Sequence, residues 1–394
     1  MTSAPQPGVS APPPRGRKYF PRLRNFWERV TDGLELQQLW GQFRSEAVAS
    51  YGLYSKDVDW DEIKSERRKG KRFFRAAWAL FQAMMMKLSP ARRVLLLVAV
   101  FLIVFEPSIP SGNTNVNLGL GWLGALILFL LLALELGDRV TMKRDLEIAR
   151  EIQQWLVPAF PPQVAGFDIA FSTRPQNTVA GDYYDAFVRP AAPTGSGPAP
   201  LLIVVADVAG KSVPAALLMA TFQASLRALS ATAASLDEIV VGIDRYARAH
   251  SLGGLRFTTS FIAEINPATR EMRYVNAGHN DPVLRRSSGA IERLSSGGPP
   301  FGLPQFTDVE IAYASGRLQL EPGDLLFVFT DGVIEAVNES GEEYGERRLL
   351  PLLASANKEV AVATLERVMT NVNAFVGYAR QHDDITALVL HVSP

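Results

Sequence analysis

Four aspartates occur in turns at or near the ends of strand-like runs, where their carboxylates could share one cleft. They are Asp182, Asp207, Asp331 and Asp383. Converging carboxylates repel one another unless a cation neutralises them, and hard oxygen ligands favour Mg²⁺ or Mn²⁺. Two such ions can share a water molecule, lower its pKa and direct it at a phosphorus atom. The pattern therefore indicates phosphate-ester hydrolysis without a covalent protein intermediate.

Each of these motifs is weak when taken singly, because an aspartate in a turn usually has only a structural role. Two other patterns can be set aside. Gly210-Lys211-Ser212 resembles the end of a Walker A loop, but Val205 stands where that loop needs a glycine. Gly181-Asp182-Tyr183-Tyr184 faintly resembles the turn of diguanylate cyclases, but the flanking residues do not continue that pattern.

The composition of the chain excludes several classes of site. None of its 394 residues is cysteine, which excludes disulfides, thiolate zinc sites and cysteine nucleophiles. The four histidines form no HExxH pair, so a zinc hydrolase is not indicated. Basic and acidic residues number 40 each, so the net charge gives no reason to expect nucleic acid as a partner. Any bound metal is therefore expected to have oxygen ligands.

The N-terminal part divides into a tail and a basic region. Residues 1–19 are rich in proline, serine and alanine and are predicted to be disordered. Residues 20–90 combine scattered aromatic residues with a basic bias and are predicted to be largely helical and cytoplasmic. The basic residues fit either an ordinary solvated face or a patch that sits on anionic lipid headgroups.

Residues 91–137 contain two apolar segments, at about 92–109 and 118–136, that are candidates for membrane spans. Their connection, residues 106–117, has no lysine or arginine, whereas basic residues flank the pair on both sides. This pattern predicts a transmembrane hairpin in the inner, cytoplasmic membrane, with both ends and the catalytic domain in the cytoplasm. The alternative is a buried pair of helices in a soluble domain.

Residues 138–158 are predicted to form a linker helix. Its amphipathic part, Thr141–Leu156, places four apolar residues on one face: Leu146, Ala149, Ile152 and Leu156. The prolines that begin at Pro158 end the helix. The helix could carry a signal, pair with its copy in a homodimer, or pack on its own domain. The sequence leaves these roles open.

From residue 159 to 394 the pattern changes to short strands with inserted helices. Five runs rich in valine, isoleucine and aromatic residues predict strands, at 167–173, 201–207, 258–266, 272–277 and 325–330. Two longer runs, 213–229 and 360–376, predict helices, and residues 189–200 predict a surface loop. Consecutive strands with inserted helices favour a layered α+β domain over a regular βαβ repeat.

The motifs occur in an order that resembles the SpoIIE-type, RsbU-like branch of the PPM family, relatives of the type 2C serine/threonine phosphatases. The resemblance covers residues from about 145 to 392 and rests on six runs: AREIQQWLVP (149–158), AGDYYD (180–185), DVAGKSVPA (207–215), YVNAGHN (274–280), TDGV (330–333) and DDIT (383–386). It implies an αββα sandwich with a two-metal centre between the sheet edges.

The resemblance also assigns roles to residues. It implies that the metal ligands are the carboxylates of Asp182, Asp207, Asp331 and Asp383, with the backbone carbonyl of Val208, and that Asp331 bridges two Mn²⁺ or Mg²⁺ ions. Asp384 and Asp185 are second choices, for which capping or support of a ligand is an equal alternative. For His279 a structural role is favoured over proton donation, and no residue is identified as a general acid.

The chain departs from the family pattern at three positions. Ala180 replaces the first glycine of the usual pair before Asp182, Ser212 replaces the second glycine of Gly-Lys-Gly, and Asp281 stands where proline is common. The four metal aspartates are intact.

By resemblance, the expected function is that of a membrane-tethered serine/threonine phosphatase. Its substrate would be a phosphorylated anti-sigma-factor antagonist of the STAS fold, in partner-switching control of a sigma factor. A helix shift near the cleft would complete the metal site. One alternative is an inactive phosphatase-fold scaffold that binds a regulatory partner. Another is a nucleotide cyclase or phosphodiesterase, for which no nucleotide-binding glycine loop is found.

Overall fold

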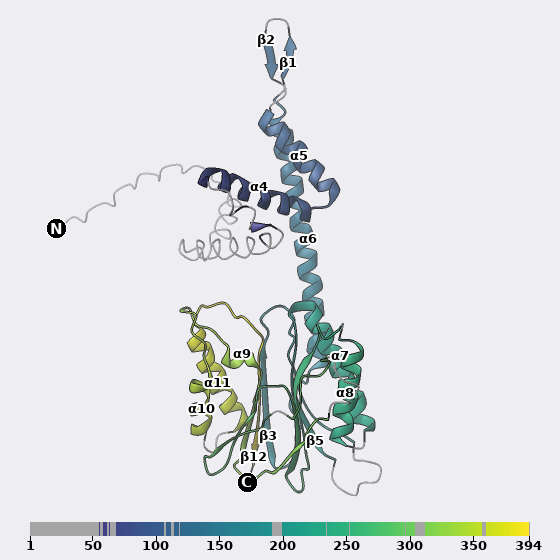
Figure 1. Cartoon of the computed structure of the whole chain (residues 1–394), viewed down its shortest axis with the longest axis vertical. Coiled ribbons are helices and arrows are strands. Elements are labelled where there is room, and N and C mark those ends of the chain that lie inside the picture. The colour runs from purple at the N-terminus through teal and green to yellow at the C-terminus, as the bar shows by residue number, and fades with distance from the viewer. Residues whose placement is uncertain are drawn as a thin grey trace, which may run out of the picture. The chain divides into compact units, whose positions relative to one another are not determined.

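The computed structural model describes residues 55, 58–60, 63, 68–105, 108–111, 114–117, 119–190, 199–233, 235–251, 253–295, 297–303, 312–356 and 360–393. The chain divides into two compact units, Met1–Gly137 and Asp138–Pro394 (Figure 1). The tail predicted for residues 1–19 lies outside the described residues, as do most of the basic region before residue 68 and most of the loop predicted for residues 189–200.

The described part of the first unit is built from helices. They are α4 (Lys69–Lys87), α5 (Pro90–Phe105) and the beginning of α6 (Gly121–Leu156). Ala99 on α5 is fully buried. A Cβ added to Gly124 of α6 would lie 2.7 Å from the carbonyl oxygen of Ala99. The missing side chain thus allows the two backbones to approach closely. Arg92 and Glu135 form an ion pair of 3.3 Å between the same helices.

Both helices nevertheless expose many large apolar side chains, among them Leu97 and Phe101 on α5 and Trp122 and Phe129 on α6. No helix within the described residues meets both the length and the apolarity that a membrane span requires. The predicted transmembrane hairpin is therefore not confirmed.

The connection between the two apolar segments contains a β-hairpin. Strand β1 (Ser108–Ser111) pairs antiparallel with β2 (Thr114–Asn117). The two residues that separate them in the sequence are Gly112 and Asn113, a composition typical of tight hairpin turns.

Helix α6 runs without interruption for 36 residues, from Gly121 to Leu156. The boundary predicted between a span that ends near residue 136 and a linker helix from residue 138 therefore lies inside one continuous helix, at the division between the two units. Only Gly137 marks the expected break, and a single glycine inside a helix is tolerated at a cost of about 1 kcal/mol. The predicted apolar face is also divided, because Leu146, Ala149 and Leu156 are half-buried whereas Ile152 is exposed.

The second unit is a sandwich of two antiparallel sheets, with strand orders β10-β7-β6-β5-β4 and β3-β12-β11-β8-β9. Helices α7 and α8 cover the outer face of one sheet, and α9, α10 and α11 lie on the outer side of the other (Figure 1). The predicted αββα fold is confirmed. The elements are β3 (Phe167–Arg174), β4 (Tyr183–Val188), β5 (Leu201–Val208), α7 (Ser212–Thr232), α8 (Leu236–Ala249), β6 (Thr258–Ile265), β7 (Glu271–Ala277), β8 (Val283–Arg285), β9 (Ile291–Arg293), β10 (Gly316–Gln319), β11 (Leu325–Phe329), α9 (Asp331–Ile334), α10 (Glu346–Ser355), α11 (Ala361–Val376) and β12 (Ile385–Val392).

Three hydrophobic cores hold these layers together. In β5, the side chains of Ile203 and Val205 pack between the sheets, whereas Leu202 and Val204 pack under α7 and α8. Strand β12 does the same on the other side, since Leu388 and Leu390 face the sheet interface and Ala387 and Val389 face α11. Both strands are buried on two faces, so their sequences are continuously apolar and their ends are fixed firmly.

All five predicted strands and both predicted helices are present. The strands β4, β8, β9, β10 and β12 and the helices α8, α9 and α10 were not predicted. Strand β4 escaped because its buried Asp185 breaks an otherwise apolar run. Helix α8 could have been found, because Leu236, Ile239 and Ile243 recur at helical spacing and Ser235 caps the first turn by accepting from the Glu238 amide.

The turn after β5 bends sharply on both sides of Lys211. Gly210 has a φ of +112° and Ser212 a φ of +65°. The left-handed region is unfavourable for a residue with a Cβ, so Ser212 is strained there. This explains physically why the family pattern has a glycine at this position.

Replacing Ser212 by glycine should stabilise the second unit by roughly 0.5–1 kcal/mol, because relief of the left-handed strain exceeds the added flexibility of the unfolded chain. Hydrogen exchange of the buried β5 amides in the full chain would measure the change. Ser225→Gly is the control, since Ser225 lies inside the same helix and its replacement should destabilise by about 0.5–1 kcal/mol. If Ser212→Gly does not slow the exchange of these amides, backbone strain at Ser212 is contradicted.

Candidate metal centre

The predicted acidic residues lie at strand ends that meet at one end of the sandwich. Asp182 immediately precedes β4 and Asp207 lies at the end of β5, and the register Tyr183↔Ala206 places the two side by side. In the other sheet, Asp331 follows β11 and Asp383 precedes β12, where Phe329 pairs with Ala387. Residues far apart in the sequence are brought together in this way.

Hydrogen bonds tie the two sheets together at this point. Thr330 Oγ1 donates to Asp182 Oδ2 over 2.9 Å, and the backbone amide of Thr386 donates to Thr330 Oγ1 over 3.1 Å. The carboxylate of Asp384 accepts two backbone amides, from Gln176 and Gly181, each at 2.6 Å. Asp384 therefore fixes the loop that carries Asp182.

Two glycines allow the backbones to approach closely here. A Cβ on Gly332 would lie 1.9 Å from the carbonyl oxygen of Asp384, so no other residue fits beside Asp331 without a shift of the chain. A Cβ on Gly181 would lie 3.3 Å from the Val208 carbonyl oxygen. The carbonyl predicted to be a ligand thus lies next to the turn that carries Asp182.

The carboxylates raise one another's pKa values. Burial raises the pKa of Asp182 well above its ordinary value, and the charges of Asp207 and Asp384 add to the effect. Burial likewise raises the pKa of Asp207 to about 7, with neighbouring carboxylates contributing. Burial, followed by the charge of Asp383, raises the pKa of Asp331. A group of acids that resists ionisation in this way is one that a cation would stabilise.

The donor set suits a hard divalent cation in its chemistry, since every predicted ligand is an oxygen and the crowded acids lack sufficient positive charge. A basic group that does contact them is Lys211, whose Nζ lies 2.9 Å from Asp383 Oδ2. As the side chains stand, no three acidic or histidine residues in the described part of the chain form a group that could hold a metal ion.

The second-choice residue Asp185 has a structural role. It is completely buried, accepts a hydrogen bond from the Tyr183 hydroxyl, and forms an ion pair of 2.7 Å with Arg227 on α7. Removal of Arg227 would leave the buried charge of Asp185 uncompensated by a cation. Asp185 thus anchors α7 to β4.

His279 is held inside the fold. Its backbone amide donates to Asn276 Oδ1 over 2.8 Å, and its Nδ1 lies 3.0 Å from Thr259 Oγ1. Burial lowers the pKa of His279 to about 4, so the ring is neutral near pH 7. These contacts favour the structural role expected for this residue.

A contact not anticipated from the sequence links α6 to the cluster. The side-chain amide of Gln153 donates from Nε2 to the Ala180 carbonyl over 2.7 Å, and its Oε1 accepts from the Ala180 amide over 2.9 Å. Ala180 is two residues from Asp182. The only sequence signal was the position of Gln153 in the first family motif.

The described residues of the second unit line a hollow beside the acids and another between α7 and α8. One, of about 180 Å³, borders the acids and is lined by Arg174, Lys211, Gly332, Glu335 and Asp383 among others.

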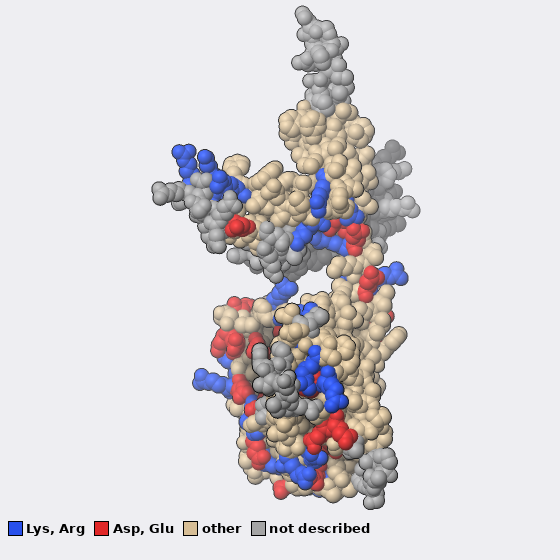
Figure 2. All heavy atoms as spheres, turned by 45° about the vertical axis from the view of Figure 1, so that its right-hand side comes forward, with Lys and Arg blue, Asp and Glu red and all other residues tan. Residues whose placement is uncertain are grey.

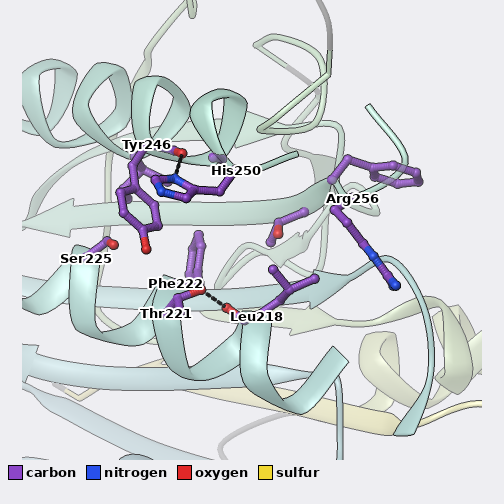
Figure 3. A pocket seen from close by; sticks show the side chains of 11 residues that line it. Leu218, Thr221, Phe222, Ser225, Tyr246, His250 and Arg256 are labelled. Carbon is purple, nitrogen blue, oxygen red and sulfur yellow. Dashed lines mark hydrogen bonds between the residues drawn. The ribbon is translucent and has the colours of Figure 1, made fainter. Parts of the chain in front are cut away.

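The other hollow lies between α7 and α8 and is drawn in Figure 3. Phe222 and Ser225 line it from one helix, and the rings of Tyr246 and His250, 4.4 Å apart, line it from the other. It measures about 40 Å³, room for a few water molecules. None of its lining residues is acidic, so it is distinct from the carboxylate cluster.

Comparison with known proteins gives matches along the same part of the chain. The sequence model of the family described as Stage II sporulation protein E (SpoIIE) matches residues 197–393, half of the chain. Protein IcfG of Synechocystis sp. is 28% identical over 320 residues, which cover 73% of this chain and 48% of IcfG. This chain thus spans about half the length of that relative. Phosphoserine phosphatase RsbU of Bacillus subtilis is 27% identical over 257 residues, covering 64% of this chain and 72% of RsbU.

Among solved structures, the SiaA-PP2C domain of Pseudomonas aeruginosa aligns with a TM-score of 0.55 and 20% identity, covering 64% of this chain and 98% of that domain. At this identity the likeness establishes the fold. The second unit therefore has a PP2C-like architecture.

Proposed function

Because this chain belongs to the SpoIIE family, we propose that its second unit is a metal-dependent phosphatase that removes phosphate from phosphoserine or phosphothreonine on a partner protein. The observation that carries the proposal is the set of carboxylates at facing strand ends, where burial and mutual repulsion raise the pKa values of Asp182, Asp207 and Asp331. The name of the relative RsbU, phosphoserine phosphatase, supports the substrate class.

Asp182, Asp207, Asp331 and Asp383, with the Val208 carbonyl, would hold Mn²⁺ or Mg²⁺. When bound, such ions lower the pKa of a water molecule and neutralise charge on the phosphoryl group. The chain's own task is to hold the ligands in place. Thr330 fixes the orientation of Asp182, and Asp384 fixes the loop before it. These contacts hold the backbone around the acids, whereas the carboxylate side chains would have to turn toward an arriving cation.

The competing scaffold hypothesis predicts the same fold without turnover. The intact set of four aspartates and their supporting hydrogen bonds favours an enzyme, because a scaffold has no need for a cluster of buried acids that resists ionisation.

Mutation of Asp331 separates the two hypotheses. The full chain should hydrolyse a phosphoserine peptide in the presence of Mn²⁺, and Asp331→Asn should lower the rate at least about 100-fold, because loss of a supporting group around a metal already costs 10–100-fold. Asp237→Asn is the control, since Asp237 pairs with Arg273 on an exposed part of the surface and should tolerate the change. Equal Mn²⁺-dependent rates in wild type and Asp331→Asn would contradict the proposal.

We propose further that the natural substrate is a phosphorylated anti-sigma-factor antagonist of the STAS fold, in partner-switching control of a sigma factor. The family resemblance supports this choice. The test is to compare kcat/KM for such a phosphoprotein with that for a phosphopeptide copied from its phosphorylation site. Equal values would show that the folded partner is not recognised.

The proposal that the chain is tethered to the inner membrane, with the second unit in the cytoplasm, draws support from the first unit. Besides the exposed apolar side chains of α5 and α6, helix α4 exposes Phe73, Phe74 and Trp78 among basic residues. These basic residues form a blue group on α4 in Figure 2. Aromatic and basic side chains together are typical of helices that lie at a lipid interface. On the face drawn, the second unit instead mixes both signs of charge (Figure 2).

Cell fractionation tests the tether. The full chain should sediment with membranes and should be released by detergent but not by high salt, because burial of apolar side chains in lipid is not screened by ions. Recovery in the soluble fraction, or release by salt alone, would contradict the tether.

We also propose that α6 carries the regulatory signal and pairs with its copy in a homodimer. Ile148, Ile152 and Trp155 form an exposed apolar stripe at spacings of four and three, the pattern of a two-helix seam. Gln153, on another face of the same helix, contacts the loop of Asp182. Ile152→Glu should convert the dimer to a monomer in analytical ultracentrifugation, and an unchanged sedimentation coefficient would exclude this seam.

Gln153 provides the test of signal transfer. Gln153→Ala should weaken Mn²⁺ binding about 10-fold, because the Ala180 backbone loses both hydrogen bonds and the loop of Asp182 becomes less ordered. Gln154→Ala removes the same side chain from the exposed neighbouring position and should leave Mn²⁺ binding unchanged. Isothermal calorimetry measures both. Identical affinities in the two variants would mean that α6 is not coupled to the site through this contact.

A further inference from the structure

Lys211 occupies an unusual position for a surface lysine. It is the last residue of the short turn between β5 (Leu201–Val208) and α7 (Ser212–Thr232), and Gly210 and Ser212 on either side of it have left-handed backbone conformations. The two bends direct its side chain away from α7 and across to the loop before β12, where its Nζ donates to the His382 carbonyl and to Asp383 Oδ2. The turn that carries one predicted ligand thus contacts another.

The contact of the Lys211 ammonium with Asp383 can be replaced by a contact with another cation. The side chains of Lys211 and Asp383 are 52% and 40% exposed. At such exposure water competes for both charges, and an ion pair gains little over the separated, hydrated groups. A divalent cation at Asp383 would therefore displace the ammonium at small cost, because it carries twice the charge and coordinates the carboxylate directly.

The displaced ammonium would remain beside a space large enough for an anion. Lys211 lines the cavity of about 180 Å³ together with Asp383, Gly332 and Arg174. Arg174 is held in its wall, since its Nε donates to Gln381 Oε1 over 2.7 Å. An ammonium on a flexible four-carbon stem can reorient and offer three donors to phosphate oxygens.

We propose that Lys211 is an exchangeable cation of the site: it neutralises Asp383 when no divalent ion is bound, and binds the phosphate group of the substrate when divalent ions take over Asp383. The proposal rests on the phosphatase function proposed above and adds a phosphate-binding residue to it. The Lys211 charge should therefore weaken the binding of Mn²⁺, with which it competes, and strengthen the binding of phosphate, which it attracts.

Lys211→Met tests the proposal because methionine keeps most of the apolar stem and removes the charge. Isothermal calorimetry on the full chain should show Mn²⁺ binding about 2–5-fold tighter than in wild type, because the competing ammonium is gone. Inorganic phosphate should bind to the Mn²⁺-loaded variant at least about 10-fold more weakly, because a charge-assisted hydrogen bond is lost. Lys211→Arg, which keeps the charge, should restore most of the phosphate affinity.

Arg256→Met is the matched control. Arg256 lies beside Gly210 of the same turn, since a Cβ on that glycine would lie 2.9 Å from its Nη1. Within the described residues, Arg256 has no hydrogen bond or ion pair with Asp383. If only the net charge near the turn mattered, this variant would change both affinities as much as Lys211→Met does, and the proposal would fail. Less than about a 2-fold change supports it.

The outcomes separate this proposal from the proposed function. Mn²⁺-dependent turnover in wild type, with unchanged phosphate affinity in Lys211→Met, would overturn the role of Lys211 and leave the phosphatase intact. If the wild-type chain binds Mn²⁺ and phosphate but shows no turnover, and Lys211→Met shifts the two affinities in opposite directions, the role of Lys211 is supported and the phosphatase function is not. If Lys211→Met loses its far-UV circular dichroism, Lys211→Gln takes its place in the same measurements.

Discussion

Crowding of carboxylates at one end of the sandwich is the constraint on which the second unit depends. Each acid is brought there by a strand that is anchored elsewhere, and burial together with neighbouring charge opposes ionisation of Asp182, Asp207 and Asp331. Such a group can persist only because the apolar layers around β5 and β12 supply the stabilisation that the acids remove. The fold thus holds together a set of carboxylates that would otherwise move apart.

The supporting contacts share one purpose, which is to limit the freedom of the loops that carry these acids. Thr330 joins the sheets through Asp182, and Asp384 uses both carboxylate oxygens on backbone amides. Gly332 permits the closest approach between the two loops. Gln153 and Lys211 reach the acidic cluster from α6 and from the β5–α7 turn, so both elements contact the loops that carry Asp182 and Asp383.

Much of this site was predictable from the sequence, and the reason is physical. Asp207 and Asp331 adjoin apolar runs that were predicted as strands, so their positions at strand ends followed from the pattern. Asp182 and Asp383 precede β4 and β12, which were not predicted, and they were grouped with the other two aspartates by the family motifs. The uses of Asp384, Gln153 and Lys211 depend on contacts between distant segments, which no local pattern reveals. The continuous α6 was missed for a related reason: membrane and linker patterns suggested two helices, whereas Gly137 is a weak helix breaker.

The metal centre can be tested by anomalous diffraction from a crystal of the chain soaked in Mn²⁺. We expect two Mn²⁺ peaks among Asp182, Asp207, Asp331 and Asp383, with the ions about 3.5–4 Å apart, and no peak there in Asp331→Asn crystals. Absence of a peak among these carboxylates in the wild-type crystal, or Mn²⁺ bound only elsewhere on the chain, would contradict the metal centre.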